Sequence, residues 1–246
     1  MNEHQEKLVK LLRQAGIRYD TWNVYSDWLY MFAAALSNGC DLSQREEREA
    51  RYLQTIRKYD KETQELFPQM AAECTMALEE YQHDEGYHDV LGETFHALEL
   101  HNKWKGQFFT PQHIADFCGM TVAGGEDMDD TIQGHGFVSV GEPACGSGVM
   151  LLGFLNAFRK LRPQGNPSRE VLLYANDLDE RCVCMAYIQL SLYGLPAVVQ
   201  HKNTLTQECS ATWFTPVYIW HGWRFKERQA QQIILDEQEA LAMLDA

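Results

Sequence analysis

Apolar residues recur at helical spacing through the first hundred positions of the chain. Over Glu3–Ala15 they lie three and four residues apart, which predicts a helix that ends before Gly16. The sequence Ser43–Glu46 is a capping box and predicts the start of another helix. Further helices are predicted over Tyr25–Leu36, from Ser43 to about Tyr59, from Asp60 with a bend or later start at Pro68, and over Tyr87–Leu100.

The pattern changes after Gly106, where short β-branched runs alternate with apolar helical stretches. Strands are predicted over Phe137–Val140, Val171–Ala175 and Ala197–Gln200. Helices are predicted over Thr110–Thr121, Val149–Leu161, Glu180–Tyr193 and Gly222–Ala246. The acidic stretch Ala123–Gly136 is predicted to be a surface loop. This alternation predicts an α/β fold with a parallel sheet and helices on both faces, so we divide the chain into a helical region over 1–100 and an α/β domain over 101–246.

The charge is acidic along the whole chain, with a net value of −14. Residues 1–105 and 106–246 each carry seven more acidic than basic side chains. DNA affinity depends largely on Lys and Arg, so the composition argues against a broad DNA-binding surface. Two local basic clusters, Arg159–Arg162 and Arg224–Arg228, could form a local DNA-binding patch. The alternative interpretation, which we favour, is that each is a solvated helix end.

Seven scattered cysteines form no C-x-x-C pair and no zinc-like spacing, so we expect reduced thiols and no metal site. The start of the chain has no secretory signal, and the apolar run near Tyr30–Leu36 is too short to span a bilayer. These features predict a cytoplasmic protein without membrane contact.

The segment Val138–Gly148 reads V-S-V-G-E-P-A-C-G-S-G, a strand followed by a glycine turn and a helix start. Glycine allows positive φ and close approach of a ligand, and the helix start offers unpaired N–H groups. The turn has neither the lysine of a P-loop nor the full G-x-G-x-x-G of dinucleotide folds. An acidic residue, Glu142, ends the strand and suits an amino group of a ligand.

Three motifs then carry a resemblance: G-Q-F-F-T-P over 106–111, E-P-A-C-G-S-G over 142–148 and Y-A-N-D-L-D over 174–179. In this order they resemble N6-adenine DNA methyltransferases of the type I restriction–modification subunit kind, over about Asp89–Thr206. The resemblance implies a class I fold that binds S-adenosylmethionine (SAM).

The expected roles in SAM binding follow from the resemblance and from the chemistry of the strand ends. Glu142 would face the ammonium group, and Asp177 would accept from the ribose hydroxyls. The residues expected to contact the cofactor are Phe108, Phe109, Thr110, Pro111, Glu142, Pro143, Ala144, Gly146, Ser147, Gly148, Asp177, Leu178, Asn203 and Leu205. For Asp179, capping of the next helix is the alternative role, and for 107–111 a hydrophobic staple with a helix cap.

The sequence departs from the family in one catalytic motif. No [DN]-P-P-[YF] follows the third predicted strand, and the nearest fragment is Trp213–Tyr218. Thr215, Pro216 and Tyr218 are therefore weak catalytic candidates. The chain ends about thirty residues after Pro216, so we expect the catalytic half of the domain to be missing or rebuilt.

Three functions remain open on these observations. The first is SAM-dependent methylation of DNA adenine, by the chain alone, as a homo-oligomer or with a partner subunit. The second is a SAM-binding relative without catalysis, such as a regulator or an anti-restriction protein of a mobile element. The third is a methyltransferase that acts on a substrate other than DNA.

Overall fold

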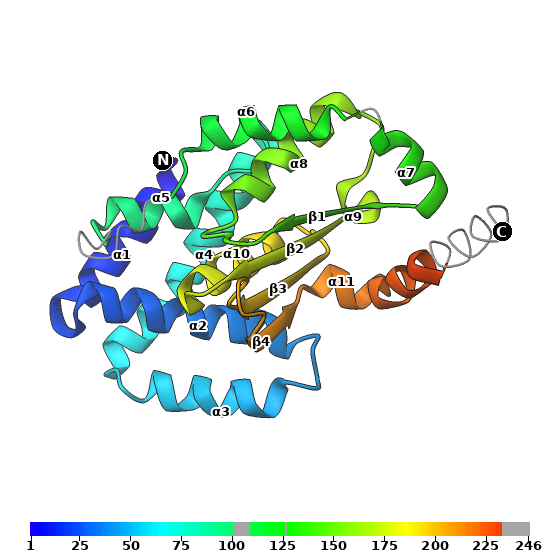
Figure 1. Ribbon diagram of the computed structural model, residues 1–246. Coiled ribbons are helices and arrows are strands. Elements are labelled where there is room, and N and C mark those ends of the chain that lie inside the picture. The colour runs from blue at the N-terminus through cyan, green and yellow to red at the C-terminus, as the bar shows by residue number, and fades with distance from the viewer. Residues whose placement is uncertain (101–108, 126, 233–246) are drawn as a thin grey trace, which may run out of the picture.

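The computed structural model describes residues 1–100, 109–125 and 127–232 (Figure 1). The helical region consists of α1 (Glu3–Tyr19), α2 (Thr21–Asn38), α3 (Arg45–Ile56), α4 (Lys61–Asp84) and α5 (Val90–Ala97). The α/β part consists of α6 (Gln112–Ala123), α7 (Asp127–His135), β1 (Val138–Glu142), α8 (Val149–Leu161), α9 (Pro167–Glu170), β2 (Val171–Asp177), α10 (Glu180–Leu192), β3 (Ala197–Lys202), β4 (Cys209–Phe214) and α11 (Pro216–Trp220). No helix in these ranges is long and apolar enough to cross a membrane.

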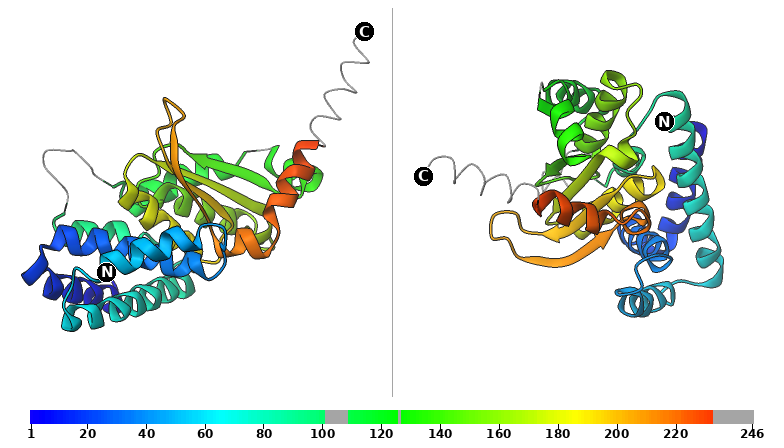
Figure 2. Two further views of the ribbon diagram at one scale, coloured as in Figure 1. Left: turned by 90° about the horizontal axis from the view of Figure 1, so that it is seen from below. Right: turned by 90° about the vertical axis from the view of Figure 1, so that its right-hand side faces the viewer.

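The described strands form one sheet in the order β1-β2-β3-β4. The first three strands are parallel, with Val140 opposite Leu173 and Leu173 opposite Ala197. β4 returns antiparallel to β3, with Phe214 opposite Val198 near the start of β3. The parallel α/β prediction is confirmed for β1–β3, whereas β4 was not predicted. The carboxyl ends of β1–β3 therefore meet at one edge of the sheet, beside the hairpin that joins β3 to β4 (Figure 2).

Alternation along each strand gives the sheet two apolar faces. Leu173 and Ala175 of β2 pack into the main core with residues of α8 and α10. Their neighbours Leu172 and Tyr174 point to the other face, where Trp223 covers them. Both faces of the sheet are thus covered by helical segments, as the alternation of strands and helices in the sequence predicts.

The helical region and the sheet share one apolar core. Residues of α1, α2, α4 and α5 belong to the same buried cluster as α8, α10 and the sheet. Helix α2 contacts α10 directly, and the hydroxyl of Tyr25 donates to the sulfur of Met185 at 3.3 Å. The boundary at residue 100 remains a prediction, since this packing runs across it.

Several predicted element ends differ from the structure. Helix α1 continues past Gly16 to Tyr19, because the turn is made at Asp20, which has φ of 66° and caps α2. Ser43 does not cap α3, since its hydroxyl donates to Asp41 instead. Helix α6 begins at Gln112 with Pro111 as its N-cap, two residues after the start of the predicted range.

The stretch predicted as a loop over 123–136 contains a helix, α7, with three acidic residues in its first turn. Acidic side chains at a helix N-terminus stabilise it through the helix dipole, which a composition-based loop prediction overlooks. In the predicted helix over 222–246, residues 223–232 are helical, and 233–246 lie outside the described residues.

Helices α6 and α8 cross in direct backbone contact at two glycines (Figure 1). A Cβ placed on Gly153 would lie 2.3 Å from the carbonyl oxygen of Ala115. A Cβ on Gly119 would lie 2.3 Å from the carbonyl oxygen of Gly153. No larger residue fits at either position without moving a helix, so the two glycines set the spacing between α6 and α8.

We expect Gly153→Ala to lower the free energy of unfolding by about 1–3 kcal/mol, because the added methyl group overpacks the crossing. The control is Gly134→Ala in α7, where an added Cβ would meet no atom within 4 Å. This control should be neutral or stabilising by up to about 1 kcal/mol. Urea denaturation of both variants measures the effect, and equal stabilities would contradict the tight crossing.

Candidate functional site

The glycine turn that follows β1 is tied to the end of the neighbouring strand. Gly146 has φ of 55° and Gly148 has φ of 100°, conformations that favour glycine. The Cys145 amide donates to the Asn176 carbonyl at 2.8 Å, which continues the pairing of β1 with β2 beyond the strand. Helix α8 starts directly after Gly148, so its N-terminus lies at this turn.

Asp177, the last residue of β2, holds the turn through its side chain. Its Oδ2 accepts from the Gly146 amide at 2.8 Å, and its Oδ1 accepts from the Asp179 amide at 2.8 Å. The carboxylate is half-buried and retains acceptor positions beyond these two bonds. The acidic residue and the glycine motif, which are 31 residues apart, therefore form one structural unit.

Phe109 lies across the same turn. A Cβ placed on Gly146 would lie 3.0 Å from Cδ1 of Phe109, so the ring rests on the glycine. The ring is held from behind by Phe95, edge-on at 5.2 Å between centroids, and the Phe109 amide donates to the His96 ring at 3.3 Å. The structure thus brings the end of the 106–111 motif to the glycine turn. Phe108 lies outside the described residues.

Glu142, Pro143 and Ala144 form the start of the turn. Glu142 is half-buried, and its Oε1 accepts from the Ala144 amide at 3.2 Å. Pro143 and Ala144 are exposed, and the Pro143 carbonyl accepts from the Thr204 hydroxyl at 2.6 Å. This last bond fastens the loop after β3 to the glycine turn.

The second side of the site is formed by the ends of β2 and β3. Leu178 is 68% exposed and Leu205 is 95% exposed. A cleft with a volume of about 380 Å³ is lined by Leu178, His201, Lys202, Asn203, Glu208, Cys209 and Ser210. The apolar side chain of Leu178 among these polar groups suits a ligand with a flat ring and hydrogen-bonding edges.

One predicted contact in this cleft needs correction. The side-chain oxygen of Asn203 accepts from the amides of Leu205 and Thr206, at 3.0 and 3.2 Å. Both of its lone pairs are used by the turn, so this oxygen is not free to accept from an adenine amino group. Asp179 caps α10 by accepting from the Arg181 amide at 3.0 Å, which confirms its alternative role.

The position of the glycine turn depends on a buried carboxylate that the motifs did not indicate. Asp89 caps α5 and is 3% exposed. Its Oδ2 accepts from the Ser147 hydroxyl at 2.5 Å. Its Oδ1 accepts from the Gly92 amide at 2.9 Å and from the Gln189 side chain at 2.9 Å. Ser147 and Gly148 are buried, so Ser147 positions the turn through Asp89 and offers no side chain to a ligand.

Gln189 and Gln112 complete this network from two other helices. The Gln189 amide also donates to the Ser147 carbonyl at 2.8 Å, and its oxygen accepts from the Leu91 amide. The Gln112 side chain accepts from the Asp89 amide at 3.1 Å. The sequence held one signal for this network: Gln189 is an uncharged polar residue in the otherwise apolar middle of α10.

The three weak catalytic candidates are not brought to this site. β4 is antiparallel, so Thr215, Pro216 and Tyr218 lie beyond the amino ends of the parallel strands. The Thr215 hydroxyl is fully buried and donates to the Leu195 carbonyl at 2.7 Å. Tyr218 is buried and donates to Glu227. These residues stabilise the sheet at the amino ends of its parallel strands, opposite the glycine turn. Within the described ranges, no cluster of His, Cys, Asp and Glu could hold a metal ion.

The comparisons with known proteins agree with the motifs. Residues 88–234 match the N-6 DNA Methylase family. A solved structure from Listeria monocytogenes, assigned to the class I S-adenosylmethionine-dependent methyltransferases, is 15% identical with a TM-score of 0.42, over 91% of this chain and 70% of that one. Similarity at this level carries no argument about function. No curated protein matches the chain.

We expect Asp89→Asn to change the pH dependence of stability. Burial raises the pKa of Asp89 above its ordinary value, although hydrogen bonds from Ser147, Gln189 and Gly92 oppose this. A carboxyl with a raised pKa in the folded state stabilises most when protonated, and this contribution is lost as pH rises through the raised pKa. Asparagine does not ionise. Its oxygen can accept from Gly92 and Gln189, and its NH2 group can donate to the Ser147 hydroxyl in place of the bond that Oδ2 accepts. The variant should therefore become more stable relative to the parent as pH rises above about 4.

The control is Asp60→Asn, where the sign is reversed. Hydrogen bonding from Thr63 at the start of α4 lowers the pKa of Asp60 to about 2, so its carboxylate stabilises the folded state above that pH. The parent should then become more stable relative to this variant as pH rises. Denaturation of the three proteins between about pH 3 and 7 measures both differences. A difference for Asp89→Asn that stays constant with pH would contradict ionisation of Asp89.

Proposed function

Because this chain belongs to the N-6 DNA methylase family, we propose that it transfers the methyl group of SAM to the exocyclic amino group of adenine in DNA. Family membership supports a SAM-dependent methyltransferase, and the DNA adenine substrate is the finer part of the proposal. The observation that carries it is the convergence on Gly146 of two distant side chains, Asp177 from β2 and Phe109 from the segment before α6.

The residues at the turn fit SAM in charge and shape. SAM combines a cationic amino acid end, two ribose hydroxyls and an adenine ring. Glu142 at the end of β1 suits the ammonium group, and the free acceptor positions of Asp177 suit the hydroxyls. The exposed side chain of Leu178 suits one face of the adenine. Two carboxylates beside a glycine turn would disfavour a phosphate, which distinguishes this site from a nucleotide site.

In this proposal the chain contributes orientation and the exclusion of water. SAM supplies a methyl group already activated by its sulfonium, so no metal is needed for the transfer. Asp177 fixes the ribose and Glu142 the amino acid end of the cofactor, and the Phe109 ring covers the turn on one side. Fixing the donor in one orientation lowers the entropic part of the barrier to transfer.

A second candidate function is binding of SAM without catalysis. It is favoured by the positions of Thr215 and Tyr218, which are buried at the opposite edge of the sheet and offer no base pocket beside the glycine turn. In addition, β1 is an edge strand among the described residues, so no further strand lies next to it to present catalytic groups.

We expect Asp177→Ala to weaken SAM binding tenfold or more in titration calorimetry, because a charged hydrogen-bond acceptor is worth about 1.5–3 kcal/mol. Asp130→Ala is the control, since Asp130 is exposed on α7 and lies outside the site. Unchanged affinity in Asp177→Ala would rule out the ribose assignment.

The activity is tested by incubating the purified protein with methyl-tritiated SAM and unmethylated bacterial genomic DNA. Label recovered in N6-methyladenine would support methyl transfer to DNA adenine, and Asp177→Ala should reduce it. SAM retained by the protein without label in DNA would support the second function. No retention of SAM would contradict both functions.

A further inference from the structure

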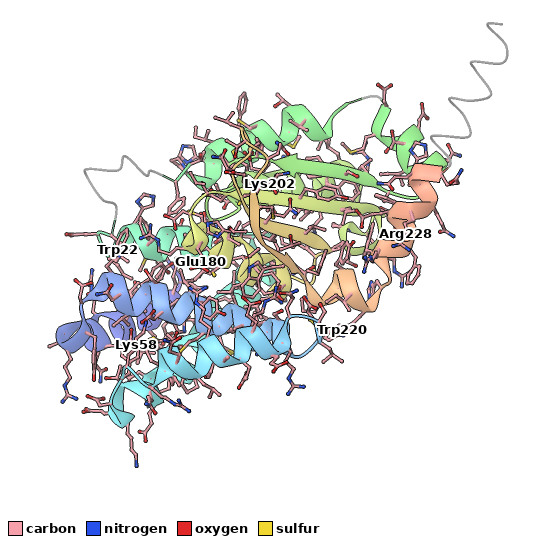
Figure 3. All side chains as sticks on the ribbon, turned by 60° about the horizontal axis from the view of Figure 1, so that its bottom comes forward. Trp22, Lys58, Glu180, Lys202, Trp220 and Arg228 are labelled. Carbon is pink, nitrogen blue, oxygen red and sulfur yellow. The ribbon has the colours of Figure 1, made fainter. Side chains whose placement is uncertain are left out.

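A second surface with its own chemistry lies on α11 and the helical residues after it. Trp220 is 69% exposed and Phe225 is 70% exposed. Arg224 and Arg228 are exposed on the same short stretch of chain. We call these four residues the aromatic–cationic patch. Figure 3 shows Trp220 and Arg228 on one side of the molecule, away from Glu180 at the start of α10.

The cations of this patch are not neutralised within the described residues. Several other arginines of this acidic chain pair with carboxylates, as Arg48 does with Asp41 and Arg51 with Glu180. Arg224 and Arg228 form no salt bridge with any residue that the structure describes. Both arginine side chains are exposed among the described residues.

The one acidic residue among them points away from the patch. Glu227 lies between Arg224 and Arg228 in sequence, but its carboxylate accepts from the hydroxyls of Tyr174 and Tyr218. Both tyrosines belong to the second apolar face of the sheet. The negative charge is thus turned toward the sheet, and the outer surface keeps the positive charges.

The helix that carries the patch packs against the sheet. Trp223 is fully buried and packs edge-on against Phe137 at 5.1 Å between ring centroids. Ala230, two residues beyond Arg228, is also buried in this cluster. The helix therefore cannot turn Trp220 and Phe225 inward without losing its own contacts with the sheet, so the exposed rings are a stable feature of the surface.

We propose that the aromatic–cationic patch binds single-stranded DNA, with phosphates at Arg224 and Arg228 and bases stacked on Trp220 and Phe225. Exposed arginines supply the charge complementarity to phosphates, and exposed aromatic rings stack on unpaired bases. A duplex does not offer such unpaired bases. The patch lies at the edge of the sheet opposite the glycine turn, so this binding does not depend on methyl transfer.

The test is fluorescence anisotropy with a labelled oligothymidylate of about 20 nucleotides at low salt. We expect Trp220→Ala with Phe225→Ala to weaken binding at least about fivefold, the lower limit for loss of base stacking. Arg224→Gln with Arg228→Gln should reduce the slope of log affinity against log salt by about 1.4, from two lost phosphate contacts. Each change is at an exposed position, and circular dichroism confirms that the variants fold.

Matched controls separate the patch from general effects. Arg45→Gln with Arg57→Gln removes the same charge from exposed positions at the two ends of α3, and Ile17→Ala removes an apolar side chain that is 84% exposed. Both controls should bind the oligonucleotide like the parent. Binding that no patch variant weakens, binding that both control sets weaken equally, or equal affinity for duplex DNA would overturn the proposal.

Discussion

The buried carboxylate of Asp89 is the interaction on which the rest of the site depends. It joins α5 to the glycine turn through Ser147 and to α10 through Gln189, while the Asp89 amide joins α6 through Gln112. A carboxylate without these partners would be costly to bury, so the network forms as a whole or not at all. The helical region therefore takes part in shaping the turn that the motifs locate in the α/β part.

The two ends of the sheet carry opposite chemistry. The carboxyl ends of β1 and β2 present the carboxylates of Glu142 and Asp177. Beyond the amino ends, Arg224 and Arg228 are exposed without carboxylate partners among the described residues.

Elements with strong local signals could be predicted from the sequence. Helix α8 has the predicted bounds, and the three parallel strands overlap the three ranges predicted as strands. β4 was missed because its pairing with β3 is set by tertiary contacts, including the packing of Trp213 beneath Arg48. Asp89 was missed for a similar reason: its partners are 58 and 100 residues away, and no local pattern encodes them.

The crossing of α6 and α8 at Gly119 and Gly153 has a consequence for motion. Where two backbones touch directly, no side chain can change rotamer to absorb a sliding movement, so the two helices move as one body. A change in the position of the Phe109 ring over Gly146 then requires rotation about the bonds of Phe109 and Thr110 rather than displacement of α6. Such rotation is a local motion, on the nanosecond to microsecond scale rather than that of domain closure.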